Sequence, residues 1–254
     1  MNRTDKKTSW DSVAEWYDDY VETSENSYQK CVILPNMIRL LDIKKGHRVL
    51  DLACGQGFFS RAFAGAGAEV TGVDASAQLI AYAKDRLPKK IHYHVASADA
   101  LGFLTPHSFD AIVIILAIQN IKNISGVFSE CRRLLADGGR FFMVMNHPAF
   151  RIPKRSEWGW DEKHRIQYRR MDGYLSESDV LIDMHPGQKQ QQTTSSFHRP
   201  LQTYINTLAK HDFAVTRMEE WISHRQSQKG PRQAAEDKAR KEIPLFLMIE
   251  ARKH

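Results

Sequence analysis

The sequence predicts an α/β fold with a mostly parallel sheet that has helices on both faces. Between residues 46 and 146, short apolar segments alternate with segments whose apolar residues recur at helical spacing. A glycine-rich turn follows the first apolar segment, which is typical of a buried strand that leads directly into a helix. Strands that alternate with helices need crossover connections, and these connections produce a parallel sheet covered on both sides.

The composition excludes several classes of protein. The chain has 254 residues, of which 42% are hydrophobic and 26% are charged, as in ordinary globular proteins. No apolar run approaches the roughly 20 residues of a membrane span, and the N-terminus lacks the apolar core of a secretory signal. The cysteines Cys31, Cys54 and Cys131 are too widely spaced for a disulfide framework or a zinc module. We therefore expect a cytoplasmic protein without a membrane partner.

The net charge of +6 is concentrated in the C-terminal part of the chain. After residue 150, Lys and Arg exceed Asp and Glu by 5. Such an excess suits an anionic small molecule or RNA as a partner. Acidic residues are interspersed with the basic ones, however, so a solvated surface of mixed charge is the simpler interpretation.

The first half of the chain predicts two N-terminal helices and five alternating strands. Helical spacing of apolar residues predicts the two helices at 10–21 and 29–41. The strands are expected at 48–52, 68–74, 91–95, 109–116 and 140–145. The connecting helices are expected at 58–66, 76–87 and 125–135, where Gly67, Pro88 and the sequence Asp137-Gly-Gly end them.

The alternation stops after Asn146. Residues 147–199 are rich in aromatic and charged side chains, and we interpret them as an insertion with one short helix near 161–170. A helix at 201–210, a strand at 213–222, a polar loop with a helical turn at 225–242 and a last strand at 245–251 follow. The chain then divides into N-terminal helices that form a lid (1–45), a core (46–146), a cap over the substrate (147–199) and a C-terminal helix with a strand pair (200–254).

The segment Asp51-Leu-Ala-Cys-Gly-Gln-Gly57 is the strongest candidate for a ligand-binding turn. Gly55 and Gly57 let the backbone approach a ligand closely where a helix N-terminus presents free N–H groups. A dinucleotide fingerprint reads G-x-G-x-x-G, but Ser60 stands at the third glycine position and Asp51 would repel a pyrophosphate. A nicotinamide-dependent (NAD) oxidoreductase is therefore the weaker alternative.

An acid stands at or just after the end of each of the first three core strands. Asp51 suits an ammonium group, Asp74 is placed to accept hydrogen bonds from a ribose diol, and Asp99 can accept one from an adenine amino group. The carboxyl ends of parallel strands meet at one edge of the sheet, so these acids should face one ligand. Ammonium, ribose and adenine in this order describe S-adenosylmethionine (SAM).

The sequence resembles the class I SAM-dependent methyltransferase family over nearly the whole chain. The matching segments are Val49-Leu-Asp-Leu-Ala-Cys-Gly-Gln-Gly57, Gly72-Val-Asp-Ala-Ser76, Ala98-Asp-Ala100, Phe109-Asp-Ala-Ile-Val-Ile114 and Leu134-Leu-Ala-Asp-Gly-Gly-Arg-Phe141. Ala53 departs from the pattern, because the family often has a further glycine there. The resemblance implies a Rossmann-like, doubly wound, seven-stranded sheet, whose last strand runs antiparallel between the fifth and the sixth.

The resemblance also implies a set of cofactor residues. These are Tyr17, Asp51, Ala53, Gly55, Gly57, Asp74, Ala75, Ala98, Asp99, Leu116 and Ala117. Asp51 would support the amino group of SAM, Asp74 the ribose hydroxyls and Asp99 the adenine. Tyr17 would close over the cofactor from the N-terminal segment.

Methyl transfer is an in-line displacement that depends on proximity and alignment and sometimes on a base. His147 is the first candidate base, because it directly follows the fifth core strand at the ligand edge. Tyr168, His164 and His185 are further candidates. Aromatic and basic residues of the insertion suit a planar or anionic acceptor, although a cap that buries its own aromatics explains them equally well.

We therefore expect a SAM-dependent methyltransferase that acts on an oxygen or nitrogen atom of a small molecule, with S-adenosylhomocysteine (SAH) as the product. A tRNA or rRNA acceptor is the alternative within the class. A SAM- or nucleotide-binding protein without catalysis is the alternative from a different class. No metal site is expected, because His92 and His94 share one strand face without a third ligand nearby in the sequence.

Overall fold

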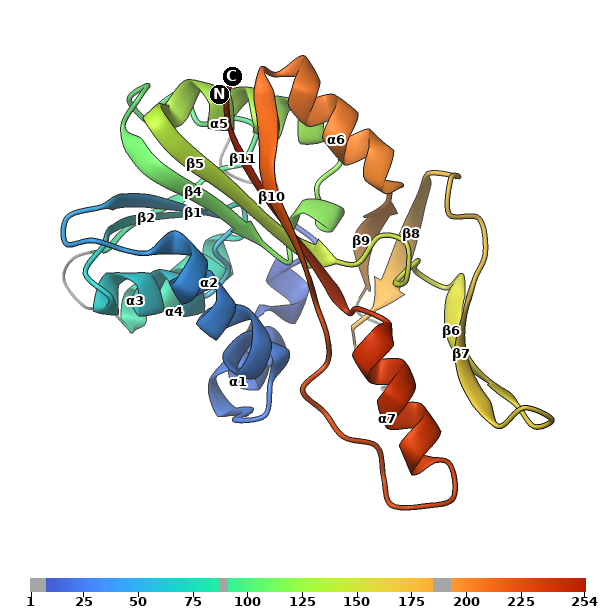
Figure 1. The fold of residues 1–254 in the computed structure, drawn as a ribbon. Helices are drawn as coiled ribbons and strands as arrows, with labels where there is room; N and C mark the ends of the chain where they lie inside the picture. Colours follow the sequence, from blue (N-terminus) through green and yellow to red (C-terminus); the bar gives the residue numbers. More distant parts are fainter. Residues whose placement is uncertain (1–7, 87–90, 185–192) are drawn as a thin grey trace.

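A computed structural model describes residues 8–86, 91–184 and 193–254. The strands of its main sheet are β1 (Arg48–Leu52), β2 (Glu69–Asp74), β3 (Ile91–Val95), β4 (Phe109–Ile115), β5 (Leu135–Asn146), β10 (Phe213–Trp221) and β11 (Phe246–Lys253). The sheet has 7 strands in the order β10-β11-β5-β4-β1-β2-β3 (Figure 1). Only β11 runs antiparallel to its neighbours in this sheet, and it lies between β5 and β10. The predicted α/β class and the predicted place of the antiparallel last strand are both confirmed.

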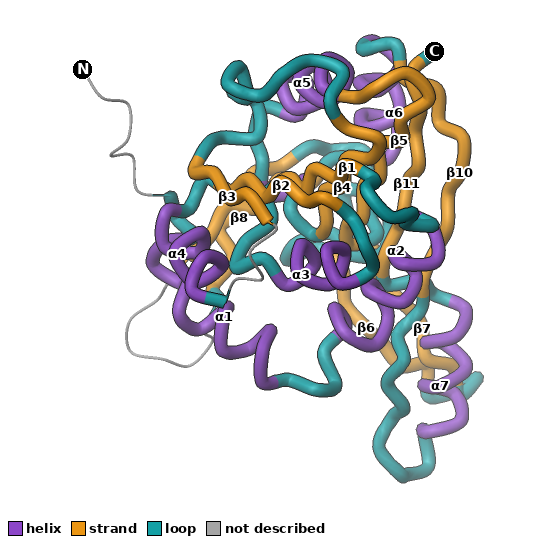
Figure 2. The backbone as a smooth tube through the Cα atoms, turned by 90° about the vertical axis from the view of Figure 1, so that its left-hand side faces the viewer, coloured by secondary structure: helices purple, strands orange, loops and turns teal. Residues whose placement is uncertain are grey.

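Helices cover both faces of the sheet. Their bounds are α1 (Ala14–Thr23), α2 (Leu34–Leu41), α3 (Phe58–Gly65), α4 (Ala77–Asp85), α5 (Ile124–Leu134), α6 (Leu201–Lys210) and α7 (Gln233–Glu242). Of these, α5 and α6 lie on one side of the sheet, and α2, α3 and α4 lie on the other (Figure 2). A 3₁₀ turn (Asp11–Val13) precedes α1, and a π-helical turn (Gln29–Ile33) precedes α2. The predicted end of α4 at Leu87 and Pro88 lies outside the described residues.

Two apolar cores follow from strands that are buried on both faces. On one face, Val113 of β4 packs in a cluster with residues of α2, α3 and α4, such as Phe63 and Ile80. On the other face, Ile112 packs in a cluster with residues of α5 and α6, such as Phe128. Because successive strand residues point to opposite faces, the continuous apolar run of β4 supplies both cores. The central strands are thereby held rigid, and their carboxyl ends form a stable platform.

The insertion contains two β-hairpins, and the helix predicted near residues 161–170 is wrong. The first hairpin pairs β6 (Ser156–Asp161) with β7 (Ile166–Met171), and the second pairs β8 (Ser178–Asp183) with β9 (Thr193–His198). Trp158 lies opposite Arg169, whose guanidinium stacks on the indole with 5.3 Å to the ring centroid. Trp158 and Arg169 would lie several turns apart on a helix and could not touch. Their contact forms only when the two strands pair, so it stabilises a hairpin rather than a helix.

The segment after β10 also differs from the prediction. It contains a full helix, α7, where a loop with a single helical turn was predicted. The sequence of α7 consists almost wholly of strong helix formers, and the helix contacts β7 of the first hairpin. Arg232, just before α7, stacks on Trp160 and pairs with Glu162 at 2.5 Å. Figure 1 shows α7 and this hairpin projecting together beyond the end of the sheet.

Two further findings concern the composition. In the described part of the chain, no helix has the length and apolar character needed to cross a membrane. Cys31, Cys54 and Cys131 are free thiols, and the last two are buried.

Candidate cofactor site

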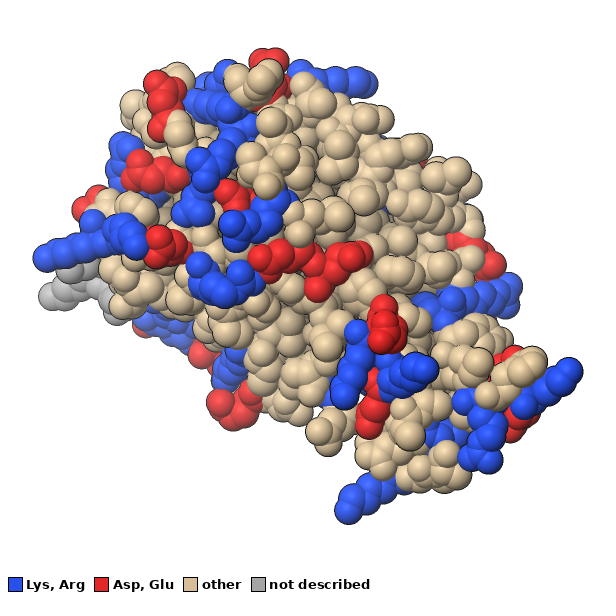
Figure 3. All heavy atoms as spheres, in the orientation of Figure 1, with Lys and Arg blue, Asp and Glu red and all other residues tan. Residues whose placement is uncertain are grey.

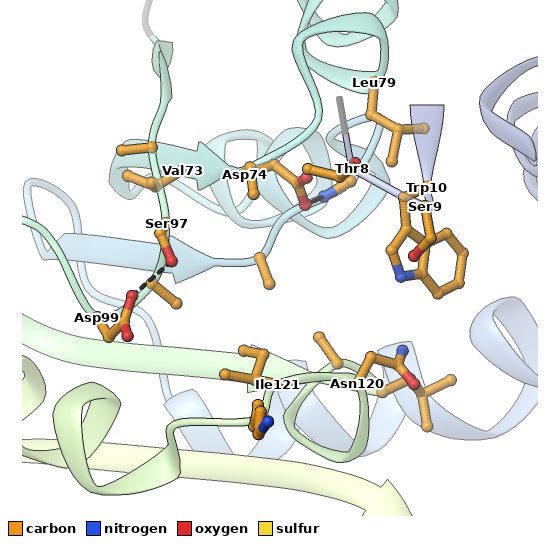
Figure 4. A pocket seen from close by; sticks show the side chains of 18 of the residues that line it. Thr8, Ser9, Trp10, Val73, Asp74, Leu79, Ser97, Asp99, Asn120 and Ile121 are labelled. Carbon is orange, nitrogen blue, oxygen red and sulfur yellow. Dashed lines mark hydrogen bonds between the residues drawn. The ribbon is translucent and has the colours of Figure 1, made fainter. Parts of the chain in front are cut away.

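A cavity of about 370 Å³ lies at the carboxyl ends of β1, β2, β3 and β4 (Figure 4). This volume falls in the range of roughly 300–1,000 Å³ that is usual for small-molecule sites. The lining includes nine of the eleven cofactor residues that the sequence analysis named: Tyr17, Ala53, Gly55, Asp74, Ala75, Ala98, Asp99, Leu116 and Ala117. The other two do not line the cavity: Gly57 ends the glycine turn, and Asp51 is buried behind it.

Asp74 is oriented by two backbone donors at the end of β2. The N–H of Gly55 donates to its Oδ2 and the N–H of Ser76 donates to its Oδ1, each at 2.8 Å. Burial raises the pKa of the Asp74 carboxyl above its usual value. Each carboxylate oxygen has two lone pairs, so both oxygens can accept a further hydrogen bond from a ligand in the cavity. Such a group is suited to a diol.

Asp51 is almost completely buried, with 1% of its surface exposed. Its Oδ2 accepts a hydrogen bond of 2.6 Å from the hydroxyl of Ser60. Burial, with a smaller contribution from the negative charge of Asp74, raises the pKa of Asp51 to about 7. Ser60 stands where a dinucleotide fingerprint has its third glycine, and here it holds the buried acid Asp51. This arrangement argues against a pyrophosphate site.

The turn between β1 and α3 has a left-handed backbone at three positions. Ala53, Gly55 and Gly57 have φ angles of 56°, 57° and 81°. A Cβ atom at Gly57 would lie 2.3 Å from the hydroxyl oxygen of Tyr93 and 3.2 Å from Cβ of Ala83. Gly57 is therefore required both by its φ angle and by the close approach of α4 and β3 to the turn.

The N-terminal segment closes one side of the cavity. The rings of Trp10 and Tyr17 meet edge to face at 5.6 Å, and both residues line the cavity. A tyrosine ring carbon, Cε1 of Tyr17, lies 3.5 Å from where a Cβ atom of Gly55 would be. Burial and the charge of Asp74 raise the pKa of Tyr17 to about 12, so its phenol stays neutral. Trp10 appears beside the cavity in Figure 4.

Ion pairs attach the N-terminal helix α1 to the core. Asp18 pairs with Arg86 at the end of α4, with 2.6 Å between Oδ2 and Nη2. Glu22 pairs with Arg61 of α3. Before α1, Asp11 accepts a hydrogen bond of 2.6 Å from the hydroxyl of Ser76. Tyr17 is thereby held over the glycine turn from both sides.

Asp99 is fixed between β3 and α5. The hydroxyl of Ser97 donates to its Oδ1 at 2.5 Å, as drawn in Figure 4, and the side-chain amide of Asn123 donates to its Oδ2 at 2.8 Å. The Ser97 contact is the main reason why the pKa of Asp99 lies below its usual value. Asn123 also caps α5 by accepting from the N–H of Gly126 at 3.0 Å. The charged carboxylate is therefore presented to the cavity in one orientation.

His147 is not part of this lining. It follows β5, as predicted, but it is only 5% exposed. Its Nδ1 accepts from the N–H of Ala149 at 3.2 Å, so Nε2 carries the proton and donates to Glu220 at 2.7 Å. Burial lowers the pKa of His147. In this arrangement neither ring nitrogen has a free lone pair with which to act as a base.

The other candidate bases lie in the insertion. Tyr168 is on β7, where its ring covers Gly159 of β6 and remains 46% exposed. His164 lies in the turn of the same hairpin and bonds Asp161 at 2.8 Å. Neither residue lines the cavity. His185 lies outside the described residues.

The lining residues that the sequence did not predict include two groups that lie apart from the predicted positions. Thr8, Ser9 and Trp10 precede the 3₁₀ turn of the N-terminal segment, and residues 120–123 follow β4. Residues 120–123 could have been predicted from the sequence, because they follow the end of β4 just as Asp99 follows the end of β3. The N-terminal residues lack such a signal, since only the packing of α1 brings them to the sheet edge.

An open, mostly parallel sheet with a glycine turn after β1 and acids at the ends of β2 and β3 agrees with the expected class I SAM-dependent methyltransferase fold. Residues 50–143 match the family described as methyltransferase domain. A solved SAM-dependent methyltransferase from Mesorhizobium loti has a TM-score of 0.70 and 28% identity, over 86% of this chain and 96% of that one. This chain thus matches a methyltransferase domain over residues 50–143 and resembles a solved SAM-dependent methyltransferase over most of its length.

Curated proteins give two further likenesses. The "Ubiquinone biosynthesis O-methyltransferase" of Dechloromonas aromatica is 37% identical over 39% of this chain and 44% of its own length. An uncharacterized protein of Haemophilus influenzae is 27% identical over 89% of both chains. This chain spans about half the length of the quinone-pathway relatives that it matches.

Proposed function

We propose that the protein transfers a methyl group from SAM to an oxygen or nitrogen atom of a small molecule and releases SAH. The observation that supports the proposal best is the cavity itself, where Asp74, Asp99 and the glycine turn face one space at the strand ends. The quinone-pathway names of the partial relatives support a small acceptor. On the face in Figure 3, basic and acidic residues are interspersed rather than gathered into the continuous basic surface that RNA binding favours.

SAM supplies an electrophilic methyl group on a sulfonium when it is bound. The cavity fits such a ligand in its volume and in its acceptor groups. We assign to Asp74 the ribose hydroxyls, to Asp99 the adenine amino group, and to Gly55 and Ala53 a close backbone contact with the methionine part. Asp51, behind the turn, supports the positive side of the ligand by its field. Tyr17 and Trp10 exclude water.

The remaining segments have proposed roles in access. Residues 1–45 act as the lid, and residues 147–199 act as the cap on the acceptor. No general base is assigned, because His147 and Tyr168 do not line the cavity. We also propose a cytoplasmic location, where SAM is made available to enzymes of this family.

Titration calorimetry with SAH tests the cofactor assignment. We expect Asp74→Asn and Asp74→Ala to weaken SAH binding by about tenfold or more, because hydrogen bonds to a charged acceptor are lost. Asp110→Asn is the matched control. Like Asp74, Asp110 accepts a hydrogen bond from a backbone N–H, here that of Arg48, and it also pairs with the Arg48 guanidinium. It lies near the start of β4 and does not line the cavity. Unchanged SAH affinity in both Asp74 variants, or binding of NAD instead of SAH, would refute the proposal.

A transfer assay separates an enzyme from a binding protein. The protein is incubated with SAM labelled on the methyl group and with small-molecule or RNA fractions of a cell extract. We expect label in the small-molecule fraction. Label in RNA would assign the alternative acceptor. Tight SAH binding without transfer to either fraction would instead indicate a non-catalytic SAM-binding protein.

A further inference from the structure

A second, smaller cavity of about 40 Å³ lies next to the cofactor cavity. It is bounded by the end of β5, the segment after it, β9 and the start of α6. Gln119 lines it, while the residues that follow Gln119 line the cofactor cavity. The side-chain N–H of Gln119 donates to the carbonyl of Leu116, which also lines the cofactor cavity, at 3.0 Å. The two cavities therefore share one wall.

Arg199 is a buried cation in this wall, with 6% of its surface exposed. Its Nη2 donates to the carbonyls of Ile121 and Lys122 at 3.0 and 2.8 Å, and both of these residues line the cofactor cavity. Its guanidinium stacks on Phe197 at 5.1 Å. Its Nη1 is buried and has no hydrogen-bond partner in the described part of the chain.

Arg151 is a second cation in the lining of the same cavity. Its Nε is buried and, within the described residues, also has no partner. Burial, followed by repulsion from Arg169 and Arg240, lowers the pKa of Arg151 to about 10. Among residues 8–86, 91–184 and 193–254, no carboxylate forms an ion pair with Arg151 or Arg199. Arg199 is buried and Arg151 is partly buried, and a desolvated guanidinium group without a counter-charge is costly to a fold.

We propose that this small cavity binds an anionic group, a carboxylate or a phosphate, of the methyl acceptor. The guanidinium groups of Arg199 and Arg151, which both line the cavity, supply the donors, and the acceptor is therefore a small organic acid or phosphate ester. One water needs roughly 10–15 Å³, so the cavity accommodates a single such group while the rest of the acceptor lies outside it. The role of the anion as part of an acceptor rests on the proposed methyltransferase function.

Gln119 adds a second element of recognition. Its Oε1 is buried in the same lining and accepts no hydrogen bond from any described residue. An unpaired acceptor next to two unpaired cationic donors suits a ligand that combines an anion with a hydroxyl or amino group. The acceptor should therefore present both, as a hydroxy acid or an amino acid derivative does.

Anion binding is measured on the full protein by NMR of ¹⁵N-labelled arginine side chains, with and without SAH. The probes are acetate, inorganic phosphate and the neutral acetamide. We expect acetate or phosphate to bind saturably and acetamide not to bind. Arg199→Met and Arg151→Met should each weaken the anion by about tenfold or more, and Arg199→Lys should weaken it less. Preference for acetate or for phosphate then identifies the acceptor as a carboxylate or a phosphate ester.

Arg140→Met is the matched control. Arg140 also donates to two backbone carbonyls, those of Leu40 and Leu41, and also stacks on a ring, that of Phe142. It does not line either cavity, so its loss should leave anion affinity within twofold. This control separates loss of anion binding from loss of a structural support.

The outcomes distinguish this inference from the proposed function. The inference would be overturned if no anion bound saturably in the millimolar range. It would also be overturned if Arg199→Met and Arg151→Met bound the anion as tightly as the wild type does. Anion binding without SAH binding would refute the proposed function and leave the anion site standing. SAH binding without anion binding would refute only the anion site.

Discussion

Replacing Gly57 by alanine places a methyl group where the structure has no room for one. Its Cβ would lie 2.3 Å from the hydroxyl oxygen of Tyr93 and 2.9 Å from Cζ of the same ring, at a φ angle of 81°. A left-handed alanine costs about 1–2 kcal/mol, and overpacking of a core costs about 1–3 kcal/mol. The lower entropy of the unfolded alanine chain offsets about 0.5–1 kcal/mol. The net loss of stability is about 1–4.5 kcal/mol, or about 2–18 °C in Tm for a chain of this size.

Tyr93→Phe provides the second half of a double-mutant cycle. The Tyr93 hydroxyl is buried and forms no hydrogen bond in the described part of the chain. Removing it should be neutral or stabilise the fold by about 1 kcal/mol. In the double variant the 2.3 Å contact of Gly57→Ala disappears while the 2.9 Å contact remains. We expect a favourable coupling energy of about 1–2 kcal/mol.

Thermal and urea unfolding followed by circular dichroism measure the four corners of the cycle. Gly65→Ala is the control, because nothing lies within 4 Å of its Cβ position at the other end of α3. It should be neutral or stabilising by about 0.5–1 kcal/mol. Additivity of Gly57→Ala and Tyr93→Phe within about 0.5 kcal/mol would show that the ring is not what excludes a side chain. A Gly57→Ala variant as stable as the wild type would refute the reasoning altogether.

Three further predictions follow from buried groups. The pKa of Asp51 is about 7 in the fold and 3.8 in a free chain, so the neutral acid stabilises the fold at low pH. As pH rises from about 4 to about 7, the Tm of the wild type should fall relative to the Tm of Asp51→Asn, with no further change at higher pH. Parallel plots of Tm against pH for the two proteins would contradict this prediction. Arg86→Met should lower the free energy of unfolding by about 1–2 kcal/mol, because it leaves the carboxylate of Asp18 on α1 without its ion pair. It should also weaken SAH binding in calorimetry without abolishing it. An unaltered SAH affinity would show that the ion pair does not hold Tyr17. His147→Asn should cost about 1–3 kcal/mol through its lost hydrogen bonds and leave the Kd for SAH within twofold; a large loss of SAH affinity would place His147 in the cofactor site after all.

Much of the core was predictable because its signals are local. The apolar run of β4 and the helical spacing of α6 each define an element by themselves, and α6 has the predicted bounds. Asp74 and Asp99 could be brought together without a structure, because parallel strands end at one edge of the sheet. The start of β5 was less predictable, since Leu135 becomes a strand residue through its pairing with Phe109 of β4.

Other features depend on partners far away in the sequence, and local periodicity does not encode them. The hairpin of β6 and β7 has mixed polarity on both faces, so neither strand shows a clear alternation, and cross-strand pairs such as Trp158 with Arg169 decide it. Thr8–Trp10 reach the cavity only because α1 docks on α4.

By itself, the sequence determined the fold class, the glycine turn and the order of the acids along the sheet edge, because strand and turn chemistry act between residues close in the chain. Only the tertiary structure decided that Asp51 stands behind the turn, that both ring nitrogens of His147 are used, and that Arg151 and Arg199 share a cavity. Burial and the supply of hydrogen-bond partners are properties of the packed chain, and these properties separate a structural side chain from one left free for a ligand.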